Sequence, residues 1–96
     1  MKIHLTVLLK SKAENIEELK SKLKELVIQS NKEVACLQYD LHQSKKDPSV
    51  FIFHEIWEDQ DGLDFHNNQS YIRDFFAISK TLLQDKPIVH STSRVE

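Results

Sequence analysis

Glycine and proline are scarce in this chain of 96 residues, which has one glycine, Gly62, and two prolines. Loops that bind the phosphate groups of nucleotides need several glycines, because their backbone approaches the phosphates closely. With one glycine the chain contains neither a phosphate-binding loop nor a dinucleotide-binding turn. The sequence therefore argues against a tightly bound nucleotide cofactor.

Cysteine is nearly absent too, and the single Cys36 cannot form a disulfide within the chain. It follows Val34 and Ala35, with no basic residue beside it to lower the pKa of its thiol. No apolar run is long enough to cross a bilayer, and the apolar start of the chain has no small-residue cleavage site. These features predict a cytoplasmic protein that does not contact a membrane.

The chain also lacks a large excess of one charge: it has 13 Lys and Arg residues and 15 Asp and Glu residues, which give a formal net charge of −2. The longest basic run is Lys45-Lys46, so we expect no binding to nucleic acid. A composition of 40% hydrophobic and 29% charged residues is typical of a globular protein. Its length predicts a single domain over residues 1–96, small enough to gain stability from a partner subunit.

Periodicity divides the chain into four predicted strands and two predicted helices. Apolar residues alternate with other residues in the strands and recur at helical spacing in the helices. The strands are predicted at 2–10, 36–43, 50–57 and 88–95. The first helix is predicted to begin after a capping-box spacing at Ser11 and Glu14 and to run to about Lys32.

The second helix is predicted to begin at Asp59 or Asp61, either of which can cap it, and to run to Gln84. We expect a kink, after which Ser70 restarts the helix. The resulting βαββαβ order is that of the split βαβ arrangement, an α+β fold of the ferredoxin-like kind. Right-handed crossovers then place both helices on one face of a four-stranded antiparallel sheet.

The second face of this sheet has no cover within the chain. Strand 50–57 has apolar residues on both faces, with Phe51 and Phe53 on one and Val50 and Ile52 on the other. A second copy of the chain is the simplest cover. The sequence therefore predicts a homodimer.

One group of residues has polar or titratable side chains and is predicted to point toward the helices. Strand alternation puts Tyr39, Glu55 and Trp57 on the helix-facing side, and the helical stripe turns His66 toward them. A buried carboxylate needs a donor or keeps its proton, so we expect His66 or a tyrosine beside Glu55. The group would suit either a small ligand pocket or a structural pair that fastens the helix to the sheet.

The histidines do not form a recognisable metal-binding motif. His4, His42 and His54 fall on the sheet face opposite to the helices, where they would meet at the interior of a dimer. A polar seam with water is the simpler interpretation. We therefore predict no metal site.

Three segments resemble the antibiotic-biosynthesis monooxygenase family, which includes bacterial quinol monooxygenases: Ala35–Gln43, Phe51–Trp57 and Asp64–His66. The ordered residues that carry the resemblance are Glu33, Tyr39, Glu55, Trp57 and His66. The chain departs from the family at Val34-Ala35, where Pro-Gly is common, so this turn is expected to differ.

The resemblance implies a homodimer whose two sheets close an α/β barrel. It also implies oxidation of a small aromatic quinol or anthrone by dioxygen, with no metal, flavin or other cofactor. On that reading the base is His66, or Glu55 acting through it. The remaining residues, Trp57, Tyr39, Phe65, Phe75 and Phe76, would bind the substrate and shape the pocket wall. Haem-degrading relatives have an asparagine in the first strand, and this chain has none there.

Two other functions fit the same scaffold. One is an isomerase or another enzyme that acts on a small metabolite, and the other is a dimer that binds a ligand without catalysis. An enzyme would need His66 for turnover, whereas in a purely structural role its replacement would mainly destabilise the fold.

Overall fold

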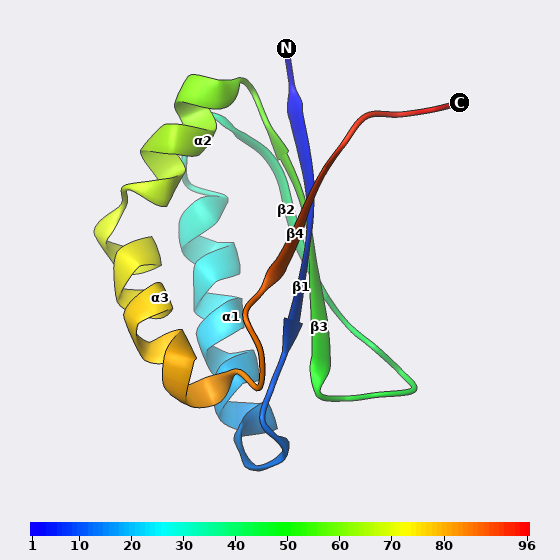
Figure 1. Cartoon of the computed structure of the whole chain (residues 1–96). Coiled ribbons are helices and arrows are strands. Elements are labelled where there is room, and N and C mark those ends of the chain that lie inside the picture. Colours follow the sequence, from blue (N-terminus) through cyan, green and yellow to red (C-terminus); the bar gives the residue numbers. More distant parts are fainter.

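The structure is a computed structural model that describes all residues from Met1 to Glu96. Four strands form one sheet, and the helices cover one of its faces (Figure 1). The elements are β1 (Ile3–Lys10), the 3-10 turn η1 (Ala13–Asn15), α1 (Ile16–Ser30), β2 (Cys36–Gln43), β3 (Val50–Trp57), α2 (Gln60–Asn67), α3 (Ser70–Leu82) and β4 (Ile88–Thr92). The predicted βαββαβ order is confirmed, with the second helix divided into α2 and α3. No helix has both the length and the apolarity of a membrane span.

The sheet has the order β2-β3-β1-β4, and all neighbouring strands are antiparallel. The central strands are β1 and β3, which pair from Ile3 with Trp57 to Lys10 with Val50. Both chain ends lie at the same end of the sheet (Figure 1). This is the four-stranded ferredoxin-like arrangement that the periodicity predicts.

The start of the first helix differs from the prediction. A capping box at Ser11 and Glu14 is wrong, because the Ser11 hydroxyl donates to the Lys12 carbonyl oxygen at 2.8 Å. Glu14 lies within the turn η1 that precedes α1, and the cap residue of α1, Asn15, makes no side-chain capping bond. The helix also ends before Lys32, where the backbone tightens into turns with hydrogen bonds between residues three apart.

A bulge changes the start of β2. Cys36 pairs with Trp57 and Gln38 pairs with Ile56, which leaves Leu37 as an extra residue without a partner on β3. Strict alternation would put Leu37 on the helix side, but its side chain is 45% exposed. After the bulge the alternation holds, and Tyr39 lies opposite Glu55.

The core fills the space between the helices and the sheet. Trp57, Phe51, Leu19 and Leu23 are completely buried in it. The other buried hydrophobic residues are Leu9, Leu26, Tyr39, Phe53, Leu63, Ile72, Phe75, Leu82 and Leu83. The three strands β1, β2 and β3 and the three α-helices contribute to this core, whereas η1 has no buried residue and all residues of β4 are exposed.

The opposite sheet face is not covered by any element of the chain (Figure 1). Leu8 lies across from Ile52 on β3 and Ile88 on β4, which gives this face an apolar row. Beside it, the rings of His42 and His54 are 5.2 Å apart in an edge-to-face arrangement. Cover by a second copy of the chain stays a prediction.

The first turn of α2 lies close to the loop before β2. The predicted cap by Asp59 is confirmed, since its Oδ1 accepts a hydrogen bond from the Gly62 backbone amide at 2.7 Å. A Cβ added to Gly62 would lie only 2.4 Å from the Cβ of Ala35. Gly62 therefore allows α2 to approach this loop.

We expect Gly62→Ala to lower the free energy of unfolding by about 1–3 kcal/mol, because the clash outweighs the better helix propensity of alanine. The double variant Ala35→Gly/Gly62→Ala removes the clashing atom and should recover most of the loss. Urea unfolding of both variants measures the effect. A single variant at least as stable as the wild type would contradict the predicted close approach.

Candidate active site

An apolar cavity of about 410 Å³ lies between the helix-facing side of the sheet and the helices α2 and α3. Of its 15 lining residues, 11 are hydrophobic, and none is Lys or Arg. The polar side chains in its wall are those of Tyr39, Glu55, His66 and Asn67. The sequence-predicted residues Tyr39, Glu55 and His66 thus meet in one wall.

His66 reaches this wall from α2 and is only 3% exposed. Its ring packs against the indole of Trp57, with 4.3 Å between ring centroids, and lies 5.7 Å from the ring of Tyr39. Aromatic neighbours on two strands therefore restrict the position of the imidazole.

The direct partner of His66 is Glu33, from the loop between α1 and β2. Nδ1 of His66 lies 2.7 Å from Oε2 of Glu33, and the hydroxyl of Tyr71 on α3 donates to the same oxygen. The other carboxylate oxygen, Oε1, is fully enclosed and has no hydrogen-bond partner. This cluster joins the loop to both α2 and α3.

Glu55 has a different donor from the one expected. Its Oε1 accepts a hydrogen bond from Nε1 of Trp57 at 2.9 Å, so the prediction of His66 or a tyrosine as its partner is wrong. Residues two apart on a strand share a face, which lets the indole reach the carboxylate. Burial raises the pKa of Glu55 to about 7, although the bond from Trp57 acts in the opposite direction.

Burial also determines the protonation of the neighbouring groups. It lowers the pKa of His66, while the hydrogen bond and the charge of Glu33 act to raise it. Burial raises the pKa of Tyr39 far above its ordinary value, so this phenol keeps its proton and remains a donor. Near neutral pH the wall therefore contains a neutral imidazole, a phenol and a carboxyl group that titrates.

Only some of the aromatic residues predicted to form the pocket wall line the cavity. Phe75 and Phe76 line the cavity. Phe65 does not line it, because Phe65 comes one position before His66 on α2 and therefore points about 100° away from it around the helix, where it is 63% exposed. Trp57 is completely buried behind the wall, where it contacts His66 and Glu55 instead of the open space.

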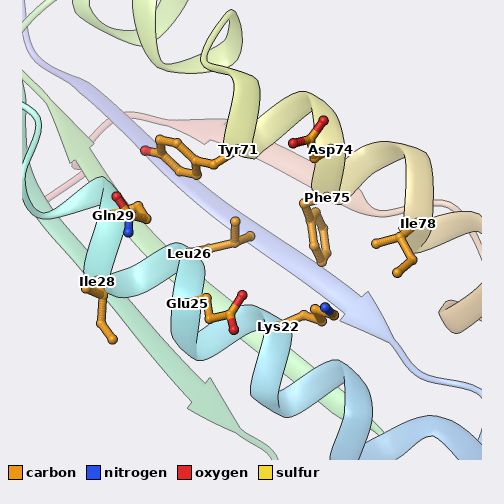
Figure 2. A pocket seen from close by; sticks show the side chains of 9 residues that line it. All are labelled: Lys22, Glu25, Leu26, Ile28, Gln29, Tyr71, Asp74, Phe75 and Ile78. Atoms are coloured by element: carbon orange, nitrogen blue, oxygen red, sulfur yellow. The ribbon is translucent and has the colours of Figure 1, made fainter.

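A second hollow, of about 530 Å³, lies between α1 and α3. Figure 2 shows its side chains, with the hydroxyl of Tyr71 directed toward α1 at one end. The charged residues Lys22, Glu25 and Asp74 line this hollow. Leu26 and Phe75 belong to both hollows and separate them. Only the first contains the predicted chemical groups.

The arrangement of the side chains does not favour a metal site or a reactive thiol. No three His, Cys, Asp or Glu side chains come together in an arrangement that could hold a metal ion. Burial, together with the charges of Glu33 and Glu55, raises the pKa of Cys36 to about 11, so its thiol stays protonated. That the protein uses no metal stays a prediction.

Periodicity could not identify Glu33 and Tyr71 as site residues. Glu33 belongs to the residues that carry the family resemblance, but it lies in a loop, where no repeat indicates which way a side chain points. Tyr71 shares the helical stripe of α3 with core residues and looks like one of them. Only the packing of α2 and α3 on the loop brings both residues to His66.

Comparisons with known proteins agree with this fold. The sequence profile named "Antibiotic biosynthesis monooxygenase" matches residues 2–78. "Putative monooxygenase YcnE" of Bacillus subtilis (strain 168) is 35% identical over 81 residues, which are 84% of this chain and 85% of that protein. The crystal structure of PA3566 from Pseudomonas aeruginosa has a TM-score of 0.93 at 30% identity, over 99% of this chain and 95% of that one. A crystal structure described as an antibiotic biosynthesis monooxygenase has a TM-score of 0.91 at 26% identity, over 98% and 99% of the two chains. This chain belongs to the antibiotic biosynthesis monooxygenase family.

Proposed function

We propose that this protein is a cofactor-independent monooxygenase that oxidises a small aromatic substrate, a quinol or an anthrone, with dioxygen. The observation that carries the proposal is an apolar cavity with the neutral base His66 and the titrating Glu55 in one wall. Membership of the family supports a monooxygenase reaction.

The walls suit a neutral aromatic molecule. A cavity of about 410 Å³ falls within the range of about 300–1,000 Å³ that small-molecule sites have. Phe75, Phe76 and Phe53 offer aromatic surface to such a molecule. Without a Lys or Arg in the wall, a phosphate group on a substrate or cofactor would find no cationic partner.

The proposed reaction begins when His66 removes a proton from the phenol or from the acidic ring CH₂ of the substrate. The electron-rich anion then reduces dioxygen itself. In an anthrone the CH₂ becomes a carbonyl group: its carbon loses four electrons, one oxygen atom of O₂ bonds to it and the other leaves as water. A quinol in the same way gives a hydroxyquinone and water. Both balances close without a further reductant, and the apolar walls keep bulk water from the anion.

Oxygen consumption by the purified, metal-free protein tests this function. A panel of hydroquinones and anthrones is supplied, and we expect uptake above the rate in buffer for at least one compound, with one equivalent of oxygen used per product. The matched control is heat-denatured protein. Uptake that never exceeds the buffer rate would contradict the proposal and favour an isomerase or a non-catalytic binding protein.

We further propose that residues 1–96 act as one domain in the cytoplasm and that two copies pair through the open sheet face. Leu8 and Ile52 are only partly buried there, and a partner would cover them. Light scattering at micromolar concentration should give twice the 11.3 kDa mass of the chain. Ile52→Lys should shift this mass toward the monomer, whereas Ile28→Lys on the exposed side of α1 should not. A wild-type mass of one chain would contradict the dimer.

A further inference from the structure

We propose that Glu33 is the positioning residue of this site: together with Tyr71 it holds the imidazole of His66 so that Nδ1 carries the proton and Nε2 remains free as the base. The role of Nε2 as a base rests on the proposed function. The position of the proton on the ring is a property of the folded protein and can be measured without any substrate.

The contact between the two side chains is short and enclosed. Nδ1 of His66 lies 2.7 Å from Oε2 of Glu33, and the two side chains are 4% and 9% exposed. A carboxylate can only accept hydrogen bonds, so the shared hydrogen belongs to Nδ1. A neutral imidazole has one N–H group, which leaves Nε2 with its lone pair and without a hydrogen bond inside the chain.

The backbone and a second donor hold Glu33 in place. Its amide donates to the Ser30 carbonyl oxygen, and its carbonyl oxygen accepts from the Cys36 amide, so the residue is fixed between α1 and β2. The hydroxyl of Tyr71 donates to Oε2, the same oxygen that His66 contacts. Two donors on one oxygen fix the plane of the carboxylate and thereby the direction of the imidazole.

The unpartnered oxygen argues against a purely structural role. Oε1 of Glu33 is fully enclosed without a hydrogen-bond partner, and a buried polar atom left in this state destabilises the fold. A carboxylate that served only to fasten α2 to the loop would gain stability from donors on both oxygens. Here both donors, one of them the proposed base, lie on Oε2.

No other charged group contacts the ring of His66. Tyr39 on β2 and Tyr71 on α3 face it as phenols whose pKa values burial raises, so both stay neutral. Glu55 on β3 shares the cavity wall but is bonded to Trp57. Glu33 is therefore the group that favours the protonated imidazole, and removal of its charge should lower the pKa of His66 further.

The substitution Glu33→Gln separates the charge from the hydrogen bond. Because Oε1 has no partner, the amide NH₂ of glutamine can take its place and leave the amide oxygen for His66 and Tyr71. Glu33→Leu removes both charge and acceptor. The wild type and both variants are compared by the ¹⁵N chemical shifts of the His66 ring, which report the tautomer, and by its pH titration.

We expect the wild type to hold the Nδ1–H tautomer. Glu33→Gln should keep this tautomer, lower the pKa of His66 and reduce kcat/KM about 10- to 100-fold, because a less basic Nε2 removes the substrate proton more slowly. Glu33→Leu should lose the tautomer preference and about 10³-fold or more in kcat/KM. The control Glu58→Gln, at an exposed glutamate directly after β3, should change none of these quantities.

An Nε2–H tautomer in the wild type, or an unchanged His66 pKa in Glu33→Gln, would overturn the inference even if the protein consumes oxygen. Conversely, the expected tautomer and pKa change in a protein that oxidises no substrate would uphold the role of Glu33 in holding the ring and contradict the monooxygenase proposal. If Glu33→Leu does not fold, the glutamine variant and the wild-type tautomer decide the question.

Discussion

Replacement of His66 by asparagine is expected to lower kcat/KM about 10²- to 10⁴-fold while the protein stays folded. The asparagine NH₂ can take the position of Nδ1 and donate to Oε2 of Glu33, so the buried carboxylate keeps its partner. Nothing in asparagine replaces the basic Nε2. Steady-state oxygen consumption measures the loss, and thermal unfolding shows whether the fold is intact.

The neighbouring Asn67 provides a control for this experiment, because it lines the same cavity but has no basic nitrogen. Asn67→Ala should change kcat/KM by only a few fold. If His66→Asn retained activity within tenfold of the wild type, another group, with Glu55 as the first candidate, would have to be the base. A loss of activity that matched a loss of folded protein would instead indicate a structural role.

The substitution Glu55→Gln is expected to change the free energy of unfolding more favourably at pH 8 than at pH 4. Burial raises the pKa of Glu55 from 4.5 to about 7, so the native protein favours the protonated carboxyl group. Below pH 4.5 the group is protonated in both the native and the unfolded state. Its ionisation therefore does not lower the free energy of unfolding there. Between pH 4.5 and about 7 only the unfolded state releases the proton, and this lowers the free energy of unfolding by about 3 kcal/mol in total.

Glutamine cannot ionise, and its amide oxygen can accept the bond from Trp57 that Glu55 accepts now. The difference in unfolding free energy between Glu55→Gln and the wild type should therefore rise by about 3 kcal/mol from pH 4 to pH 8. Urea unfolding at both pH values measures it, and the difference cancels the effects of other titrating groups. Glu58→Gln should show no such rise. An equal difference at both pH values would show that Glu55 ionises normally in the native state.

Much of the fold can be predicted from the sequence because the strand patterns are strong and local. Alternation over 36–43 and 50–57 predicts the bounds of β2 and β3, and the polar stretch between them predicts the hairpin. The same alternation places Tyr39, Glu55 and Trp57 on the buried face. It holds for Tyr39 because the bulge at Leu37 comes before it and ends at Gln38.

The partners of the inward residues could be predicted only in part. The bond from Trp57 to Glu55 follows from their spacing on one strand face, so the sequence contained that signal. The contact between His66 and Glu33 joins a helix to a loop far away in the chain. Periodicity predicts which face of the helix His66 is on, but it does not predict which side chain His66 will contact. Phe65 lies outside the cavity because a residue next to His66 on a helix points about 100° away from it.

The most direct test of the central claim follows the oxygen atoms. Metal-free protein is supplied with isotopically labelled dioxygen and the anthrone or quinol that it consumes fastest, and the product is analysed by mass spectrometry. The proposed reaction predicts one labelled oxygen atom in each product molecule and the other in water, at a rate that His66→Asn lowers at least about 10²-fold. A product without label, or labelling at the same rate in His66→Asn, would contradict monooxygenase chemistry in this cavity.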